Sequence, residues 1–433
     1  MSREEIEQVE KELDEVLEIV QRPVPVKNTG REETVSLQEN LQENDPLQEE
    51  MQIETEKEEK EEKEDSPESA AKEQTAVSEE ELDLEDDIEN GYFHFLRPSD
   101  GLIAAFFVPV AVLIILFAQR GIFPFGEECF LRTDMYHQYA PFFSEFQYKL
   151  KQGGSLLYSW DIGMGVNFSA LYAYYLASPV NWLIILCPKK FIIEFMTILI
   201  MVKTGLCGVT FTWYLDHHFE KKHFVAGVFG IFYALSGYMA AYSWNIMWLD
   251  CILLFPVIML GLEQLVQEKK GLFYCVTLGL SILSNYYISI MICIFMVMYV
   301  IVQVILYPPK KIKDLVATGV RFGFYSLLAG GLAAVVLLPE IYALQATASG
   351  DFDFPKTISC YFSIFDMIAR HIGNVGTEIG LDHWPNIYCG VAVFLFFLLY
   401  LACKKISAKE KSVYCGLLLL FFASFSVNAP NFI

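Results

Sequence analysis

Long apolar runs separated by short polar segments dominate this chain after about residue 100. The run from Gly101 to Ala118 contains no charged residue and is long enough to cross the hydrocarbon core of a membrane as a helix. Similar runs follow at 192–215, 224–243, 248–266, 272–289, 290–307, 315–338, 387–403 and 412–428. The pattern predicts an all-α polytopic membrane protein with about nine transmembrane helices.

Composition changes sharply near residue 92. Residues 1–90 contain 9 Lys or Arg against 33 Asp or Glu, a balance of −24, so the formal net charge of −22 leaves about +2 for the rest of the chain. The stretch from Glu54 to Asp65 consists almost wholly of Glu and Lys, which bury too little apolar surface to offset the entropy of an ordered chain. We therefore expect residues 1–92 to form an acidic disordered tail and residues 93–433 to form a multi-pass membrane domain.

Basic residues in short loops predict the orientation of this domain. These loops contain Lys221-Lys222, Lys269-Lys270, Lys310-Lys311 and Lys404-Lys405. All of them fall on one side if the nine runs cross the membrane, and the positive-inside rule makes that side cytoplasmic. We therefore expect a multi-pass protein of the cell membrane whose tail is cytoplasmic. Residues 119–190 and 339–386 then form two large loops on the outer side.

The apolar stretch from Phe168 to Cys187 needs a separate interpretation, because every later basic loop would move outside if it crossed the membrane. We expect a re-entrant or interfacial segment, since broken polar backbone is tolerated at membrane depth where it lines a cavity. Before it, Pro141 and Gly153-Gly154 mark the two ends of a helix. One face of that helix is apolar and the other polar, which is typical of a helix that lies in the membrane interface.

Several linked motifs resemble bacterial YfhO-type membrane proteins. These motifs are Asp134…Gln138-Tyr139…Pro141-Phe142, Gly154 to Trp160, Gly163 to Phe168, Tyr174 to Asn181 and Ser284 to Ser289. The resemblance covers about residues 95–433. It implies a GT-C-like helical bundle, in which an integral glycosyltransferase takes a sugar from a polyprenyl-phosphate carrier on the outer face. It also implies a cell-surface polymer such as teichoic acid as acceptor, and a chain truncated at its C-terminus, because family members are commonly longer.

The same resemblance places a catalytic carboxylate in the first outer loop, and this position corresponds to Asp134. Glycosyl transfer needs a general base for the acceptor hydroxyl, or a carboxylate that holds a metal ion or an attacking group. From the residues alone, Asp134 is equally well explained as the N-cap of the following helix or as an exposed loop acid. The Cys and His spacing predicts no metal site, and no cofactor is identified, although a divalent cation held by a carboxylate stays an alternative.

Polar and aromatic residues of the same loop are candidates for substrate binding. Arg132 could pair with a carrier phosphate or with a nearby carboxylate, and His137 could relay a proton. Aromatic rings here could stack on a sugar or anchor the protein at the membrane interface. The candidates are Arg132, His137, Gln138, Tyr139, Trp160, Asn167, Tyr174, Tyr175 and Asn181. Asn245, Asp250, Asn285 and Glu340 are further candidates, for which a helix end or an interhelical hydrogen bond is the alternative.

Two classes of function therefore compete. The first is a membrane glycosyltransferase that uses a sugar linked to polyprenyl phosphate, with membrane lipid and a surface polymer as its partners. The second is a transporter or flippase of a lipid-linked sugar, which should show similar repeats in its two halves. The sequence contains no clear internal repeat, and its basic residues are scattered through short loops, so nucleic-acid binding is not expected.

Overall fold

A computed structural model describes residues 97, 99–222, 224–345, 355–373, 376–379 and 384–428. The acidic tail predicted for residues 1–92 lies outside these described residues, so its disorder stays a prediction. The predicted truncation is likewise untested.

Six helices in the described part are long and apolar enough to cross a membrane. They are α4 (Asp100–Gln119), α7 (Ile192–His218), α8 with α9 (Phe224–Ala234 and Gly237–Tyr242), α10 (Leu249–Gln267), α12 (Tyr286–Leu306) and α13 (Ile312–Leu332). These six agree with six of the runs predicted from the sequence. The all-α membrane class is therefore confirmed.

The other three predicted runs form helices that are either too short or not apolar enough to cross a membrane. The described part of the chain therefore supports six spanning helices, where the sequence predicted about nine. Helix α11 (Leu272–Ser284) has 13 residues and α16 (Val391–Ala402) has 12. A helix of 13 residues is about 20 Å long, which is shorter than a hydrocarbon core of about 30 Å. Helix α17 (Ala408–Ser426) is longer, but Lys409, Glu410 and Lys411 occupy its first turn.

The boundary between α11 and α12 lies earlier than hydropathy predicts. Asn285 has an extended backbone with φ of −161° and caps α12 by accepting a hydrogen bond from the Ile288 N–H. A residue with extended backbone interrupts a helix, and Asn is among the best N-caps. The apolar residues on both sides hide this break from a hydropathy scan.

The segment that the sequence predicts as re-entrant or interfacial is a sharply bent helix pair. Helix α6 (Phe168–Tyr175) and the 3-10 helix η2 (Pro179–Leu186) meet at an angle of 106°. Pro179 lies in the first turn of η2, where its missing N–H costs nothing. If this pair were counted as one span, the number of spanning helices would rise to seven.

The helix predicted between Pro141 and Gly153 is α5 (Ala140–Gln152), which ends at a left-handed Gly153 with φ of 66°. No membrane is present in the structure, so its predicted interfacial character stays a prediction. Phe143, Phe146 and Gln147 are buried on neighbouring parts of one face, whereas Pro141, Tyr148 and Gln152 on the opposite side are exposed. The Gln147 amide donates to the Ile184 and Cys187 carbonyls, each at 2.8 Å. The Gln147 amide is therefore satisfied by protein rather than by water.

A short hairpin completes this outer-loop region. Strands β1 (Tyr158–Ser159) and β2 (Val166–Asn167) pair antiparallel, with Tyr158 opposite Asn167. The Lys149 ammonium donates to the Tyr158 carbonyl at 2.9 Å and so connects α5 to the hairpin. The 3-10 helix η3 (Lys189–Phe191) then leads into α7.

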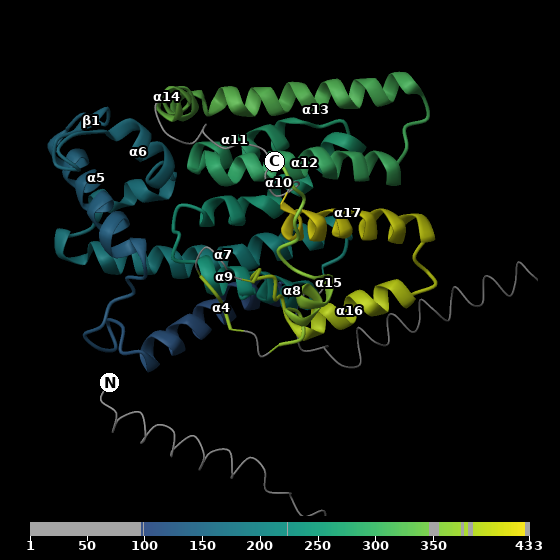
Figure 1. Cartoon of the computed structure of the whole chain (residues 1–433), viewed down its shortest axis with the longest axis horizontal. Coiled ribbons are helices and arrows are strands. Elements are labelled where there is room, and N and C mark those ends of the chain that lie inside the picture. Colours follow the sequence, from purple (N-terminus) through teal and green to yellow (C-terminus); the bar gives the residue numbers. More distant parts are fainter. Residues whose placement is uncertain are drawn as a thin grey trace, which may run out of the picture. The chain divides into compact units, whose positions relative to one another are not determined.

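The outer-loop elements gather at one end of the long helices. Figure 1 shows α5, α6 and β1 together at this end, with α14 (Ala334–Leu344) near α6. Helix α15 (Ile364–Ala369) packs near α17. We call the end that carries α5 and α6 the loop end of the molecule.

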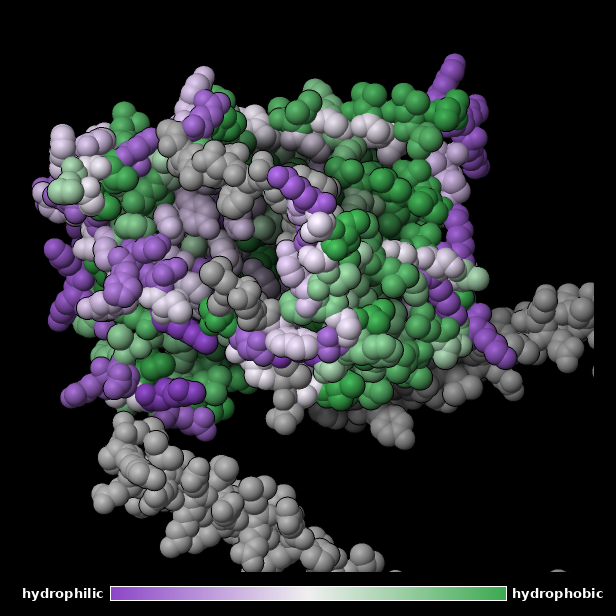
Figure 2. Space-filling view, viewed as in Figure 1, coloured by the Kyte–Doolittle hydropathy of each residue, from purple (hydrophilic) through white to green (hydrophobic). Residues whose placement is uncertain are grey.

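The basic loops lie at the opposite end of the same helices. Helices α7, α10 and α12 all begin at the loop end, since Ile192, Leu249 and Tyr286 pack there against α5 or α6. Their C-termini therefore lie at the other end, where they are followed by Lys221-Lys222, Lys269-Lys270 and Lys310-Lys311. Figure 2 shows hydrophilic side chains at both ends with apolar surface between them. For these three loops the relative arrangement predicted from the sequence is thus present, and which end is cytoplasmic stays a prediction.

Candidate functional site

A cavity of about 250 Å³ lies at the loop end, where three separate parts of the chain meet. The segment after α4 provides Asp134, Gln138 and Tyr139, and α6 provides Tyr174 and Tyr175. The turn between α9 and α10 provides the remaining lining residues, which are Tyr242, Trp244, Asn245, Met247 and Trp248. We call this space the aromatic cavity.

Asp134 immediately precedes a short π-helix, η1 (Met135–Tyr139). It occupies the N-cap position, but its side chain accepts no capping hydrogen bond. The structure therefore does not contain the N-cap, whereas the exposed carboxylate agrees with both a loop acid and a ligand-binding group. Single π turns occur often at functional sites. Here the wide turn carries both Gln138 and Tyr139 to the cavity.

Hydrogen bonds fix Gln138 and Tyr139, the last two residues of this turn. The Tyr139 hydroxyl donates to Asn245 Oδ1 at 2.7 Å, and the Tyr175 hydroxyl donates to Gln138 Oε1 at 3.0 Å. The Tyr139 ring also stacks on Trp244, with ring centroids 6.0 Å apart. Burial raises the pKa of the Tyr139 hydroxyl above its usual range, and the neighbouring Tyr175 and Asp134 add to this effect. Tyr139 is therefore a neutral hydrogen-bond donor.

Asn245 has hydrogen-bonding capacity that the protein does not use. Its side chain is 2% exposed, and its Nδ2 atom has no hydrogen-bond partner among the described groups. A buried amide without a partner costs about 1–3 kcal/mol, so such an atom is expected where a ligand supplies the missing acceptor. Because Asn245 lines the aromatic cavity, its two amide protons can bind an acceptor oxygen placed there.

A buried ion pair holds the turn that carries Asn245. Lys203 in α7 and Asp250 in the first turn of α10 are both buried, and Lys203 Nζ lies 2.6 Å from Asp250 Oδ2. The same ammonium donates to the Ile246 carbonyl at 3.2 Å. Asp250 was predicted as a lining residue, and the structure corrects this, since its charge is used inside the protein. Lys203 was missed because a single Lys in an apolar run gives no signal of its partner.

Asn285 and Glu340 follow the alternatives that the sequence left open. Asn285 is a helix cap, and its amide also donates to the Tyr174 carbonyl at 2.9 Å. Glu340 accepts a hydrogen bond from the Tyr286 hydroxyl at 2.6 Å. Asn285 thus bonds to α6 and Glu340 to α12, and neither residue lines the aromatic cavity.

The structure brings together five of the ten site residues predicted from the sequence, namely Asp134, Gln138, Tyr139, Tyr174 and Tyr175. The other five lie elsewhere. Trp160 is 75% exposed and packs edge-on against Tyr158. Asn167 caps α6, and Asn181 is buried with its amide bonded to the Leu176 carbonyl. His137 is exposed beside Tyr136 and does not line the cavity.

Arg132 lines a second and larger cavity of about 850 Å³, which runs between α4 and the α8–α9 pair. We call it the α4 groove. It lies next to the aromatic cavity, because Arg132 is two residues from Asp134 and Ser243 lies between the cavity residues Tyr242 and Trp244.

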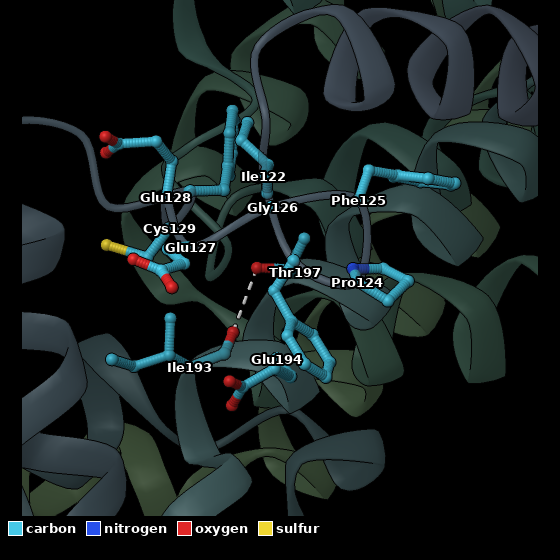
Figure 3. A pocket seen from close by; sticks show the side chains of 12 residues that line it. Ile122, Pro124, Phe125, Gly126, Glu127, Glu128, Cys129, Ile193, Glu194 and Thr197 are labelled. Carbon is cyan, nitrogen blue, oxygen red and sulfur yellow. Dashed lines mark hydrogen bonds between the residues drawn. The ribbon is translucent and has the colours of Figure 1, made fainter.

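A third cavity of about 570 Å³ is lined by Glu127, Glu128 and Glu194 with several apolar residues. Figure 3 shows these carboxylates spread around the space rather than converging on one point. The Thr197 hydroxyl donates to the Ile193 carbonyl at 2.9 Å and is not free. Within the described ranges, no group of three or more Cys, His, Asp or Glu side chains is placed to hold a metal ion.

Comparison with known proteins gives one match. The family described as bacterial membrane protein YfhO matches residues 104–433, which include all three cavities. No curated protein and no solved structure matches the chain. Since the match extends over most of the sequence, the resemblance carried by the loop motifs is confirmed, and the chain belongs to the YfhO family of bacterial membrane proteins.

Proposed function

We propose that this YfhO-family protein is a membrane glycosyltransferase that transfers a single sugar held in the aromatic cavity. The observation that carries the proposal is the composition of this cavity. It combines the exposed carboxylate of Asp134, the aromatic rings of several Tyr and Trp residues, and the Asn245 amide nitrogen, which has no partner among the described groups. Carbohydrates present C–H faces that pack on aromatic rings and hydroxyls that pair with carboxylates and amides.

The size of the cavity supports a small neutral ligand. A space of about 250 Å³ is of the order of one hexose with its hydroxyl groups. Apart from Asp134, the lining side chains carry no formal charge, since they are Tyr, Trp, Gln, Asn and Met. Such a lining favours a neutral polar ring over an ion, because an unpaired ion would lose its hydration without compensation.

The proposed reaction uses Asp134 as a general base. The carboxylate removes the proton from an acceptor hydroxyl while that oxygen forms a bond to the anomeric carbon of the sugar. The bond between this carbon and the carrier phosphate oxygen breaks, and the polyprenyl phosphate leaves with the bonding electron pair. A carboxylate that holds a divalent cation is an alternative way for Asp134 to assist the same displacement.

The identities of donor and acceptor in this proposal rest on the family resemblance. The donor is a sugar on a polyprenyl-phosphate carrier, and the acceptor is a cell-surface polymer such as teichoic acid. In this arrangement the loop end faces the outside of the cell and the acidic tail is cytoplasmic. The helices α11, α16 and α17 would complete a GT-C-like bundle of about nine spans, if the membrane is thin where they lie.

A transporter or flippase of a lipid-linked sugar is the second candidate. One observation favours it, namely the break of 106° between α6 and η2 beside the aromatic cavity. Discontinuous helices of this kind form the binding sites of many transporters. A transporter, however, needs no general base, so substitution of Asp134 by a neutral isostere separates the two candidates.

The deciding experiment compares Asp134→Asn with the matched control Asp161→Asn. Asp161 is an exposed acid in the same loop that does not line the aromatic cavity. Sugar transfer to the surface polymer is measured in a deletion strain that carries each variant. Loss of a general base should lower the rate roughly 10²–10⁴-fold, whereas the control should be near wild type. Near-normal transfer by Asp134→Asn would remove this residue from catalysis and shift support to the transporter.

A further inference from the structure

We propose that the α4 groove binds the phosphate head group and the first apolar units of a membrane amphiphile, with Arg120 and Arg132 as the phosphate ligands. The proposal deepens the proposed function and rests on it only for the identity of the sugar-bearing lipid. The groove itself suggests an anionic amphiphile through its shape, its charge and its place beside the aromatic cavity.

The walls of the groove are apolar over most of their length. Helix α4 contributes Val112, Leu113, Leu116 and Phe117, and the α8–α9 pair contributes Leu235 and Met239. At 1.5 Å per residue, the α4 wall rises about 12 Å from Val112 to Arg120. An alkyl or isoprenoid chain could lie along this wall and bury its surface there.

The end of this wall carries positive charge. Arg120 is the C-cap residue of α4, and Arg132 follows on the loop that lines the same groove. Within the described chain, neither guanidinium forms an ion pair, and both side chains are exposed at the rim. Glu128 also lines the groove, so the three charges leave a net positive rim. A guanidinium binds phosphate oxygens with two parallel hydrogen bonds, which makes Arg the preferred side chain for this anion.

The groove also lies where a lipid can enter. Helix α4 presents Ile103, Phe107 and Ile115 to the surroundings, each more than half exposed. This face is the lipid-facing surface of a helix that is apolar enough to span the membrane. A lipid that moves along this face reaches the groove without leaving the hydrocarbon. Its head group then meets the two arginines at the end of α4.

The α4 groove and the aromatic cavity are adjacent, so one ligand could occupy both. Only Thr133 separates Arg132 from Asp134 along the chain, and Ser243 separates the cavity residues Tyr242 and Trp244. Thr133 has a left-handed backbone with φ of 46°, so the chain turns sharply between the two sites. A phosphate on Arg132 would therefore lie beside a sugar in the aromatic cavity, as the two halves of one lipid-linked sugar require.

The test measures binding of undecaprenyl phosphate to the purified full chain in detergent micelles. The variant Arg120→Gln/Arg132→Gln is compared with Lys189→Gln/Lys190→Gln, which removes two exposed charges near the loop end but outside the groove. We expect the arginine variant to weaken binding about tenfold or more, and the lysine control to stay within about twofold of wild type. Equal weakening by both pairs would indicate unspecific attraction and overturn the proposal, as would wild-type affinity of the arginine variant.

A steric variant tests the groove without a change of charge. Ala240 lines the groove and is exposed, so Ala240→Trp should fill the space without disturbing the core. It should weaken binding of undecaprenyl phosphate while both arginines remain. Unchanged binding would mean that the apolar chain does not lie in the groove.

Competitors then separate a lipid head group from a free anion. Inorganic phosphate and uncharged undecaprenol should each compete poorly with undecaprenyl phosphate. Displacement by inorganic phosphate at equal concentration would reduce the groove to an anion site and overturn the lipid assignment. Asp134→Asn should keep lipid binding and lose transfer, so failure of the groove proposal and failure of the proposed catalytic role give different results.

Discussion

The Tyr139 hydroxyl donates to Asn245 Oδ1 at 2.7 Å and joins two segments that are 106 residues apart in the sequence. This bond connects the π turn after Asp134 to the α9–α10 turn, so it closes the aromatic cavity between them. It also orients the Asn245 amide, since Oδ1 is occupied and Nδ2 is left for a ligand.

We predict that Tyr139 and Asn245 are energetically coupled. Tyr139→Phe should cost about 1–3 kcal/mol in the free energy of unfolding, because the buried Asn245 amide would lose the hydroxyl that donates to its Oδ1 atom. Asn245→Leu in the Tyr139→Phe background should cost less than it does alone. Unfolding in mixed micelles, followed by tryptophan fluorescence, provides the four values of the cycle. If the effects of the two substitutions on the free energy of unfolding were strictly additive, the coupling energy between Tyr139 and Asn245 would be zero and the prediction would be wrong.

The raised pKa of Tyr139 predicts a dependence of stability on alkaline pH. The folded state favours the protonated hydroxyl, whereas an unfolded chain ionises Tyr near pH 10. This contribution is therefore fully present below about pH 10 and is lost as the pH rises above it. Between about pH 9 and pH 11, Tyr139→Phe should lose less stability than wild type. If the free energies of unfolding of wild type and Tyr139→Phe changed with pH in parallel, the contribution of the Tyr139 hydroxyl would be contradicted.

The ion pair between Lys203 and Asp250 should be important to stability even though it is not in the cavity. Lys203→Met leaves a buried carboxylate without its cation, which typically costs about 3–5 kcal/mol. Lys203→Met/Asp250→Leu removes both charges and should recover much of this loss. The surface pair of Lys270 with Glu268 offers a control, because its exposed charges contribute about 0–1 kcal/mol. A single variant as stable as the Lys270→Met control would show that the pair does not hold the α9–α10 turn.

The sequence predicted the long helices well because an apolar run has a local signal. Runs at 101–118, 192–215 and 248–266 correspond to α4, α7 and α10 with small shifts at their ends. It failed where polar residues cap or interrupt a run, as Asn285 does between α11 and α12. It could not show that Gln147 is buried, because the carbonyls that accept from its amide lie 37 and 40 residues away.

The site could be predicted only in part for the same reason. Asp134, Gln138 and Tyr139 lie in one short segment, so a single aromatic and acidic stretch indicated them. The α9–α10 turn joins them through contacts that no local pattern encodes. Lys203 lies 47 residues from Asp250, and its charge inside an apolar run looks like an isolated exception until the fold supplies its partner.

Residues 1–90 should be dispensable for membrane insertion and for sugar transfer. They contain all of the net negative charge and lie outside the family match, which begins at residue 104. A variant that lacks them should reach the membrane fraction in wild-type yield and keep transfer activity in the deletion strain. A truncated chain that is absent from the membrane fraction would show that the tail takes part in targeting or folding.

The loop end should face the exterior of the cell, because only that orientation places the basic loops of the opposite end in the cytoplasm. Ser155 is exposed between α5 and β1 at the loop end, and Lys270 is exposed after α10 at the other end. Each is replaced by Cys in a background in which the exposed Cys129 and Cys360 are Ser. An impermeant thiol reagent should label Ser155→Cys in intact cells and Lys270→Cys only after lysis. The reverse result would place Asp134 in the cytoplasm, where no surface polymer is available, and would remove the proposed acceptor. Labelling of both variants in intact cells would mean that the helices between them do not separate the two positions across the membrane.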